Sequence, residues 1–434
     1  MNRIVDIGKT LLVDGPASVI VTSGKVEVFG FKLGNSSKIV IREGKRLPFV
    51  VEKTANFEIS LGANATIEEV DGTTIPKSWM KSPEELLSFQ TRPVTTVVLG
   101  TVDSGKTSFC TYLVNKLIDE KQKVAILDGD LGQSDIGPPC TIAYTFVAKP
   151  VTDLFSLEAE NGFFVGATSP SEAMDKTVEG LMTLRREILC NAPDFVVVNT
   201  DGWVVGEDAV KYKSRLVEEL KPDIVFCIQQ KDELAPLLDV LEKIRKTIVD
   251  SPIAIRQRSR EKRKNLRELG YVKYLRNAKV QSLPIDWVKI KENSFLGLGI
   301  ERTNVQQAKK VYEISGIKSL HYVEAKDKIF MVVGKNRVIS TDDIKKVEEV
   351  IRKKVVLVHE GEEEGLLLGL YDSHRKFLGI GVLREVDYSR RTLKIFTPVS
   401  EGISNVMFGK VKLDKNLREI SAFIEGNLSG FTKF

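Results

Sequence analysis

The sequence predicts a mixed α/β protein whose central domain is built on a doubly wound, mostly parallel sheet. We expect an N-terminal β-sandwich domain before it and a smaller, mainly β C-terminal domain after it. Between residues 94 and 283, apolar runs of strand length alternate with amphipathic stretches of helix length, as in parallel sheets covered on both faces. Short β-rich runs separated by turn residues fill both flanks. The 434 residues are enough for roughly two to four domains.

The N-terminal domain is predicted to span residues 1–78. Its β-rich runs cover residues 18–22, 25–30 and 38–41, and turn-forming pairs such as Ser23-Gly24 separate them. Short strands at this spacing are typical of a sandwich or barrel. Residues 79–93 are polar and contain two prolines, so we expect a linker with one helical turn.

The central domain is predicted to span residues 94–283. Its strand candidates are near-continuous apolar runs, and they cover residues 94–99, 123–127, 195–199 and 224–228. Amphipathic helix candidates between them include residues 173–189 and 209–220. Ligands of such folds bind at the carboxyl ends of the strands, so functional residues are expected there.

The C-terminal domain is predicted to span residues 284–434 and to be mainly β. Strand-like patterns recur at residues 328–333, 355–358, 366–370, 378–382 and 393–396. A helical pattern at residues 342–354 interrupts them.

Composition favours a cytoplasmic protein. The four cysteines are scattered, which suits a reducing compartment, and the three histidines form no pattern of zinc ligands. We find no signal peptide and no apolar stretch of membrane-spanning length, so no membrane association is expected. The net charge of +5 says little about partners, whereas the local distribution of charge says more.

Residues 100–107 read G-x-x-x-x-G-K-T and directly follow the strand predicted at residues 94–99. In a strand–loop–helix unit of this kind, the loop amides and the helix N-terminus point at one spot and bind phosphate. Lys106 reaches the outer phosphates, and the Thr107 hydroxyl can ligate Mg²⁺. The residues expected to bind the nucleotide are Gly100, Asp103, Ser104, Gly105, Lys106, Thr107 and Ser108.

Acidic residues follow the second predicted strand, at Asp128 and Asp130. A carboxylate at this strand tip can hold Mg²⁺ or accept a proton from an attacking hydroxyl group, although acidic residues after strands also simply form turns. We favour Asp130 as the functional residue, because it lies further past the strand and nearer the expected crevice.

Residues 168–172 precede the helix predicted at residues 173–189. Ser169 and Glu172 have the spacing of a capping box, with Pro170 at the first helical position. A capped helix start at this edge of the sheet also binds anions, so Thr168 could contact a substrate phosphate. The pattern leaves the capping role and the binding role equally open.

Trp203 follows an Asp-Gly turn at the end of the third predicted strand. Such turns lie at the surface, so a place in the central core is not expected. The indole could pack against a neighbouring loop or stack on a nucleobase.

Residues 256–267 form the most basic stretch, with seven basic residues and one acidic residue among twelve. Solvated helices usually mix both signs of charge, so this density indicates a polyanion nearby. If the stretch is helical, Arg263 and Arg267 share one face. Arginines on a mobile helix suit a lid that closes over phosphates.

Together these motifs resemble the polynucleotide 5′-hydroxyl kinase family, which includes the RNA kinase subunit of the pre-mRNA cleavage factor and the ribosomal-RNA-processing kinases. Residues 102–107 resemble its phosphate loop, 127–133 its L-D-x-D-x-G-Q element, 168–170 its T-x-P clasp and 199–203 its N-T-x-G-W element. Arg258, Ser259, Arg263 and Arg267 match its lid pattern. Val102, Cys140 and Asp201 depart from the family's usual residues, but no group that the reaction needs is missing. The plain, Lys-rich chain suggests an archaeal member.

The resemblance implies ATP-dependent, Mg²⁺-dependent phosphorylation of the 5′-hydroxyl end of RNA, with DNA left open as a second substrate. It implies catalytic roles for Asp130, Lys106, Arg258 and Arg263, and Mg²⁺ ligands in Thr107 and Asp130. It also implies substrate contacts for Gln133, Thr168, Trp203 and Arg267. Protein partners in RNA processing are left open.

Two other functions share the phosphate loop. A GTPase or ATPase switch could use residues 128–133 as its switch segment, but the guanine-reading pattern N-K-x-D is missing, since residues 229–232 read Gln-Gln-Lys-Asp. A non-catalytic scaffold could bind ATP structurally inside an RNA-processing complex. The presence of Asp130 and of the lid arginines argues against that scaffold.

Overall fold

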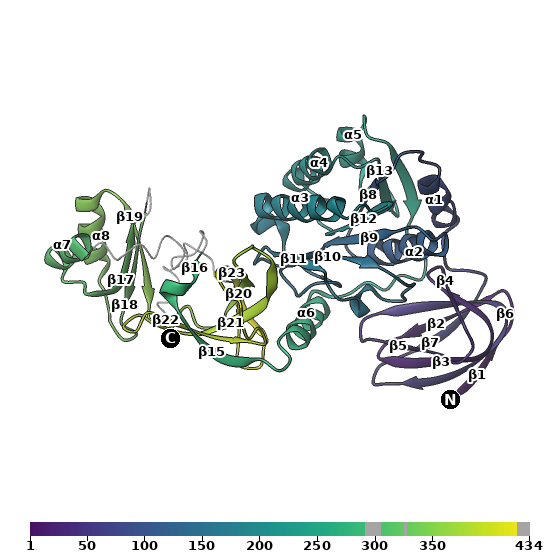
Figure 1. Ribbon diagram of the computed structural model, residues 1–434, viewed down its shortest axis with the longest axis horizontal. Coiled ribbons are helices and arrows are strands. Elements are labelled where there is room, and N and C mark those ends of the chain that lie inside the picture. The colour runs from purple at the N-terminus through teal and green to yellow at the C-terminus, as the bar shows by residue number, and fades with distance from the viewer. Residues whose placement is uncertain (291–304, 325–327, 423–434) are drawn as a thin grey trace. The chain divides into compact units, whose positions relative to one another are not determined.

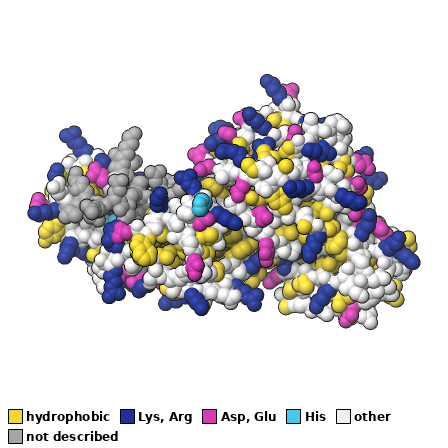
Figure 2. All heavy atoms as spheres, viewed as in Figure 1, with side chains coloured by type: hydrophobic (Ala, Val, Ile, Leu, Met, Phe, Trp, Pro, Cys, Tyr) yellow, Lys and Arg dark blue, Asp and Glu magenta, His cyan; other side chains and the backbone are white. Residues whose placement is uncertain are grey.

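The computed structural model describes residues 1–290, 305–324 and 328–422 (Figure 1). The chain divides into two compact units, Met1–Arg267 and Glu268–Phe434. On the face drawn in Figure 2, Lys and Arg side chains are dispersed among Asp and Glu side chains.

The first unit begins with a seven-stranded antiparallel sheet in the order β4-β3-β6-β2-β7, with β1 paired to β6 and β5 paired to β3. Its strands are β1 (Asn2–Val5), β2 (Lys9–Asp14), β3 (Ala17–Val28), β4 (Phe31–Leu33), β5 (Ser37–Ile41), β6 (Arg46–Leu61) and β7 (Ile67–Asp71). Register shifts interrupt the β3–β6 pairing between Val21 and Val26. Such irregularities bend a strand, and the two ends of β3 accordingly pair with different neighbours, β5 and β4.

Helix α1 (Lys77–Leu87) follows this sheet and is longer than the single helical turn expected in the linker. Trp79 and Leu86 are fully buried, and the Trp79 indole N–H donates to the carbonyl oxygen of Asp250 at 2.9 Å. Ser82 and Pro83 occupy the remaining positions of the same buried face. Because these two residues are not typical of an apolar helix face, the sequence lacks the amphipathic pattern that would have predicted the helix.

The central sheet has seven strands in the order β11-β10-β9-β12-β8-β13-β14. They are β8 (Val94–Gly100), β9 (Val124–Gly129), β10 (Thr141–Val147), β11 (Asn161–Phe164), β12 (Phe195–Thr200), β13 (Ile224–Gln229) and β14 (Lys246–Asp250). Neighbouring strands pair in parallel along β9-β12-β8-β13-β14, whereas β10 pairs antiparallel with both β9 and β11. The four predicted strands are confirmed, and β8, β9 and β12 are buried along their whole length. Strands β10, β11 and β14 were not predicted.

Helices cover both faces of the central sheet. Helix α2 (Lys106–Asp119) and α1 pack on one face, in a hydrophobic core that continues into the N-terminal sheet. Helices α3 (Met174–Cys190) and α4 (Glu207–Leu220) pack on the other face. Shorter elements are η1 (Leu154–Ser156), η2 (Pro170–Glu172) and α5 (Ala235–Val240). The mixed α/β fold with helices on both faces of a mostly parallel sheet is confirmed.

The second unit contains a sheet in the order β15-β22-β21-β20-β23-β16, with β24 paired to β23, and a separate three-stranded sheet β17-β18-β19. The strands are β15 (Lys279–Pro284), β16 (Lys289–Ile290), β17 (Ser319–Glu324), β18 (Lys328–Val333), β19 (Lys354–His359), β20 (Leu366–Tyr371), β21 (Phe377–Asp387), β22 (Thr392–Thr397), β23 (Asn405–Leu413) and β24 (Glu419–Ala422). Its helical elements are η3 (Ile285–Trp287), α7 (Val305–Ser315) and α8 (Thr341–Ile351). The C-terminal domain was predicted to begin at residue 284. Strand β15 lies almost wholly before that residue and nevertheless pairs with β22. The domain boundaries at residues 78, 93 and 283 stay a prediction.

Candidate active site

The glycine-rich loop, residues 100–107, joins the end of β8 to the start of α2. A Cβ atom on Gly100 would lie 2.6 Å from Ser104 Oγ, and Gly105 has a φ of 101° that favours glycine. The Ser104 hydroxyl is buried and has no hydrogen-bond partner among the described residues. A buried hydroxyl of this kind needs a polar partner, and a phosphate group on this loop would provide one.

Lys106, the first residue of α2, is only 6% exposed. Its Nζ donates to the carbonyl oxygen of Thr101 at 2.6 Å, and within the described chain no carboxylate lies at ion-pair distance. Burial lowers the pKa of Lys106 to about 8, even though the more distant Asp130 favours the charged form. The loop therefore holds a cation that lacks a nearby counter-charge.

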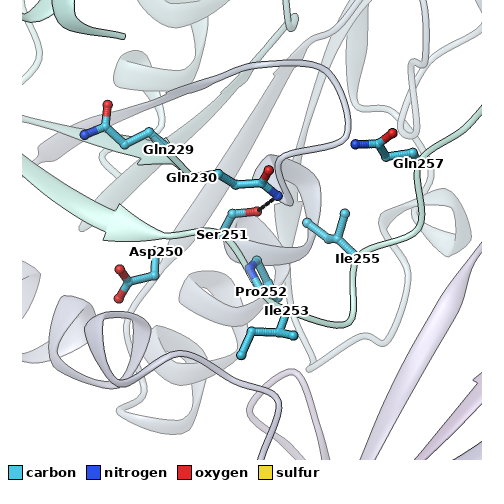
Figure 3. A pocket seen from close by; sticks show the side chains of 8 residues that line it. All are labelled: Gln229, Gln230, Asp250, Ser251, Pro252, Ile253, Ile255 and Gln257. Atoms are coloured by element: carbon cyan, nitrogen blue, oxygen red, sulfur yellow. Dashed lines mark hydrogen bonds between the residues drawn. The ribbon is translucent and has the colours of Figure 1, made fainter. Parts of the chain in front are cut away.

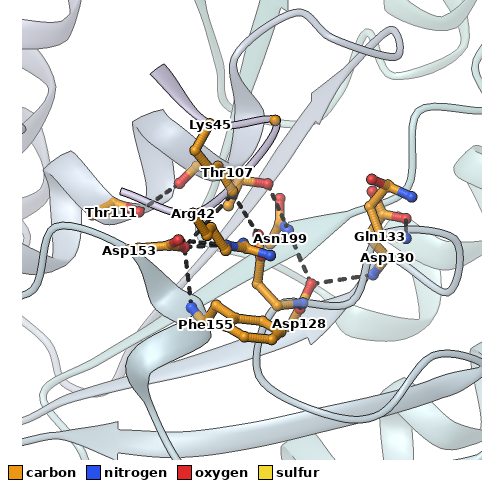
Figure 4. A network of polar contacts seen from close by, with 12 residues as sticks. Arg42, Lys45, Thr107, Thr111, Asp128, Asp130, Gln133, Asp153, Phe155 and Asn199 are labelled. Carbon is orange, nitrogen blue, oxygen red and sulfur yellow. Dashed lines mark hydrogen bonds and ion pairs between the residues drawn. The ribbon is translucent and has the colours of Figure 1, made fainter. Parts of the chain in front are cut away.

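Asp128 is fully buried at the end of β9, where it organises the following segment (Figure 4). Its Oδ2 accepts hydrogen bonds from the backbone N–H groups of Asp135 at 2.7 Å and Ile136 at 3.3 Å. Its Oδ1 accepts from the Asn199 side chain at 2.9 Å. Burial raises the pKa of Asp128 to about 7, with Asp135 and Asp130 adding to the effect. Asp128 thus shapes the loop that carries Asp130.

Asn199 lies in β12 and connects the acidic strand tip to the glycine-rich loop. Its Nδ2 donates to Asp128 Oδ1 and, more weakly, to Thr107 Oγ1 at 3.4 Å. Parallel pairing of β9 and β12 places Asn199 opposite Asp128. The sequence motif included Asn199, but we assigned it no role, because its partners come from strands far apart in the chain.

Asp130 has one carboxylate oxygen engaged and one available. Its Oδ1 accepts from the backbone N–H groups of Gly132 at 3.1 Å and Gln133 at 3.0 Å. Its Oδ2 makes no hydrogen bond to any residue that the structure describes. Burial raises the pKa of Asp130, while Lys106 acts in the opposite direction. The backbone therefore fixes the carboxylate and leaves an oxygen free for a metal ion or a hydroxyl group.

The arginine-rich stretch lies against the glycine-rich loop, through the start of helix α6 (Arg260–Tyr274) and the residues before it. Asp103 Oδ2 accepts from the backbone N–H of Arg258 at 2.9 Å and from Arg263 Nη1 at 3.4 Å. Gln133 Nε2 donates to the carbonyl oxygen of Arg263 at 3.1 Å. The structure therefore brings the loop, the acidic tip and two of the predicted lid arginines together.

The turn that joins β5 to β6 in the N-terminal domain also contacts this region. Arg42 forms an ion pair with Asp153 (Figure 4). It also pairs with Asp135, and Lys45 Nζ lies 3.1 Å from Asp135 Oδ2. These cations outweigh the effect of burial and hold the pKa of Asp135 below its usual range. Arg258 Nε donates to the carbonyl oxygen of Gly44 at 3.1 Å. None of these N-terminal contacts was predicted.

Thr168 lies beside the Asp130 loop, since a Cβ atom on Gly132 would sit 3.1 Å from the Thr168 carbonyl oxygen. The predicted capping of an α-helix by Ser169 is wrong in detail. Ser169 accepts a weak hydrogen bond from the Ser171 N–H and caps the 3₁₀ turn η2, and α3 begins only at Met174. The binding role of Thr168 stays a prediction.

Trp203 is half-buried and stacks on Tyr212, with ring centroids 5.7 Å apart and an angle of 24° between the rings. The turn before it packs on the glycine-rich loop, because a Cβ atom on Gly202 would lie 2.6 Å from the Val102 backbone nitrogen. Trp203 is thus held next to the expected phosphate site. Arg267 is half-buried on α6, one turn after Arg263, and its contact with substrate stays a prediction.

A pocket of about 300 Å³ opens at the carboxyl ends of β13 and β14 (Figure 3). It is lined by Gln229, Gln230, Asp250, Ser251, Pro252, Ile253, Ile255 and Gln257. Ser251 Oγ donates to the Ser104 carbonyl oxygen at 2.9 Å, and Pro252 packs close to Gly105. The pocket therefore adjoins the glycine-rich loop, and we did not predict it from the sequence.

Two features are absent from the described residues. No group of three or more His, Cys, Asp or Glu side chains is arranged to hold a metal ion. No helix in this part of the chain is long and apolar enough to cross a membrane.

Comparison with known proteins agrees with the predicted resemblance. Residues 100–277 match the family model described as the mRNA cleavage and polyadenylation factor CLP1 P-loop. A polyribonucleotide 5′-hydroxyl-kinase of Pyrococcus furiosus is 30% identical over 350 residues, which cover 80% of this chain and 95% of the relative. One of Methanocaldococcus jannaschii is 29% identical, with coverage of 76% and 90%.

The solved structure of the Clp1p–Pcf11p complex contains a chain that matches this fold with a TM-score of 0.65. The match covers 95% of this chain and 97% of that chain at 14% identity, so the likeness is one of fold. Sequence identity to the two archaeal relatives extends over nearly their whole length. The chain therefore belongs to the family of polyribonucleotide 5′-hydroxyl-kinases.

Proposed function

We propose that this protein transfers the γ-phosphoryl group of ATP to the 5′-hydroxyl end of RNA. The observation that carries the proposal is the convergence of three groups on one loop: buried Lys106, the half-free carboxylate of Asp130, and the arginine pair that contacts Asp103. Phosphoryl transfer depends mostly on positioning and on stabilisation of charge, which are the properties that these groups supply.

The glycine-rich loop would bind the triphosphate of ATP. Its backbone amides and the N-terminus of α2 would face the phosphates, together with the unpartnered hydroxyl of Ser104. Lys106 would lie against the outer phosphates and gain a counter-charge that no described residue provides at ion-pair distance. We include Gly100, Asp103 and Ser108 in this binding set on the basis of the sequence motif.

Thr107 and Asp130 would hold Mg²⁺. Both offer hard oxygen ligands, and Mg²⁺ commonly takes one or two protein ligands and completes its shell with phosphate oxygens and water. When bound, the ion neutralises part of the charge on the phosphate oxygens. Asp130 suits this role because its Oδ2 makes no hydrogen bond to the described protein, whereas both oxygens of Asp128 are occupied.

Asp130 would also orient the 5′-hydroxyl group and take its proton. The O5′–H bond breaks, a bond forms between O5′ and the γ-phosphorus, and the bond from that phosphorus to the leaving oxygen of ADP breaks. Arg258 and Arg263 would leave Asp103 and stabilise the charge on the transferring group.

Four residues around the loop would position the RNA end. Gln133 and Thr168 adjoin the Asp130 loop, Trp203 would stack on the terminal base, and Arg267 would contact the backbone. We also place the protein in the cytoplasm, since its four cysteines are scattered along the sequence and three of them are buried, which suits a reducing compartment.

Incubation with γ-labelled ATP, Mg²⁺ and a 5′-hydroxyl RNA tests the proposal. We expect label at the RNA end, and none on the same RNA that already carries a 5′-phosphate. A matching DNA oligonucleotide measures the preference between RNA and DNA. ATP hydrolysis without transfer would instead support a nucleotide-dependent switch, and bound, unhydrolysed ATP beside 5′-hydroxyl RNA would support a scaffold.

A further inference from the structure

Three buried polar residues lie directly beneath Trp203. Asp201 is 4% exposed, Tyr212 is 2% exposed and Lys213 is fully buried. Asp201 follows β12, whereas Tyr212 and Lys213 lie in α4. A lysine buried this deeply is rare unless a carboxylate pairs with it. Here the Lys213 ammonium lies 2.8 Å from Asp201 Oδ2.

Asp201 gathers several donors around one carboxylate. Its Oδ2 accepts from the Tyr212 hydroxyl at 3.0 Å and from Lys213 Nζ, and its Oδ1 accepts from the Trp203 backbone N–H at 2.9 Å. Lys213 Nζ also donates to the Asp201 carbonyl oxygen at 3.0 Å. One side chain therefore fixes both the backbone of Trp203 and the tyrosine on which its indole stacks.

The stacked pair stands next to the glycine-rich loop. Gly202, between Asp201 and Trp203, packs so closely on Val102 that it has no room for a Cβ atom. A displacement of this turn would change the distance between the indole and the phosphate site. The position of Trp203 thus sets where a stacked base lies relative to the reacting phosphate.

We propose that Asp201, Tyr212 and Lys213 are positioning residues that hold the Trp203 indole as a platform for the terminal nucleobase of the acceptor strand. This inference rests on the proposed kinase function. We call the three residues the base support. The base support does not touch the reacting atoms, and it acts by fixing one ring plane at a set distance from the glycine-rich loop. Stacking of this kind tolerates every base, because each has a flat face.

Two acceptor substrates separate this inference from the kinase function. One is a 5′-hydroxyl RNA with a terminal adenosine, and the other is the same RNA with a terminal abasic ribose. We define the base factor as the ratio of their kcat/KM values. For the wild-type protein we expect a base factor of about ten or more. We expect Trp203→Leu to reduce this factor to about one.

Variants of the base support test the role of its members. Tyr212→Leu removes both the ring and the hydroxyl, and should bring the base factor close to one through a higher KM for the adenosine-ended RNA. Tyr212→Phe keeps the ring, so its base factor should fall only about threefold, in line with the loss of one hydrogen bond. The KM for ATP should stay unchanged in both variants. Tyr388→Phe is the matched control, since Tyr388 is also a tyrosine that donates to a buried carboxylate, that of Glu363, in the second unit.

Asp201→Asn alone would leave the Lys213 charge buried and could unfold the protein. The double variant Asp201→Asn, Lys213→Met removes both charges and should fold. We expect its base factor to fall at least as far as that of Tyr212→Phe. Each folded variant is verified by a cooperative thermal transition.

The outcomes are distinct. Wild-type protein that phosphorylates both RNAs equally would overturn the inference and leave the kinase function standing. Base-support variants that slow both RNAs by the same factor would show a purely structural role and would also overturn it. Wild-type protein that phosphorylates neither RNA would refute the proposed function, and the inference with it.

Discussion

Replacement of Lys106 by methionine should stabilise the free protein while it abolishes phosphoryl transfer. Lys106 is 6% exposed, and among the described residues its ammonium group donates only to the carbonyl oxygen of Thr101. A charged group that is buried without a counter-charge costs free energy of folding. Methionine fills a similar volume without charge and is compatible with the first turn of α2.

The magnitude follows from the pKa of Lys106. Burial lowers this pKa from 10.5 to about 8, and at neutral pH that difference corresponds to roughly 3 kcal/mol of lost stability. Methionine also loses the hydrogen bond to Thr101, which offsets about 1 kcal/mol of the gain. We therefore expect Lys106→Met to raise the free energy of unfolding by about 2 kcal/mol at pH 7.

The pH dependence has a definite sign. Between pH 8 and 10.5 the unfolded chain binds the lysine proton more tightly than the folded protein does, so wild-type stability gains from rising pH in this window. The variant lacks this gain. The stabilisation of the variant should thus be full below pH 8, fall to zero at about pH 10 and leave the variant about 1 kcal/mol less stable than the wild type above pH 10.5, where only the lost hydrogen bond remains. Titrating groups that do not interact with Lys106 cancel in the comparison.

Urea denaturation followed by tryptophan fluorescence measures the effect. Trp287 is 79% exposed and lies in the second unit, so both proteins carry Trp287→Phe to make the signal report on Trp79 and Trp203. ATP should raise the midpoint of the wild-type protein and leave that of the variant unchanged. A variant that is less stable than the wild type at pH 7, or a difference that persists unchanged to pH 10.5, would refute the reasoning.

Three other substitutions test the roles of Asp130, Arg42 and Asp103. Asp130→Asn should lower kcat by about 10²–10⁴-fold in the label-transfer assay, with ATP affinity by calorimetry little changed; an equal loss of affinity would contradict the catalytic role. Arg42→Ala should cost about 2 kcal/mol in urea denaturation at pH 7, because buried Asp135 loses one of two cationic partners and keeps Lys45. That cost should shrink as acid protonates Asp135. Asp103→Asn should release Arg263, which limited trypsin digestion without ATP would detect as faster cleavage of the arginine-rich stretch; unchanged cleavage would count against it.

The fold was predictable where burial on both faces leaves a continuous apolar run. Strands β8, β9, β12 and β13 have this pattern, and all four were predicted to within a few residues. Edge strand β14 is short and mostly half-exposed or exposed, so its sequence carries no such signal. Helix α1 escaped prediction because Ser82 and Pro83 occupy half of its buried face.

The site was predictable where its chemistry is local in sequence. Lys106, Thr107 and Asp130 belong to short motifs whose spacing fixes their geometry. Asn199 and Arg42 take part through contacts between distant segments, such as the 93 residues that separate Arg42 from Asp135. A contact of that kind depends on how the strands pair and how the sheets pack, which a single sequence does not specify.

The pairing of charges around the glycine-rich loop indicates which ligand completes the site. Buried Lys213 has the carboxylate of Asp201, and the two lid arginines have Asp103. Lys106 is the exception in this described region, since it contacts only a carbonyl oxygen. Since the protein neutralises buried Lys213 but not buried Lys106, we expect the negative charge that faces Lys106 to come from a ligand. Because Asp103 belongs to the same loop, we expect an anion on Lys106 to compete with Asp103 for the two arginines, so that nucleotide binding would favour closure of the arginine-rich stretch over the phosphates.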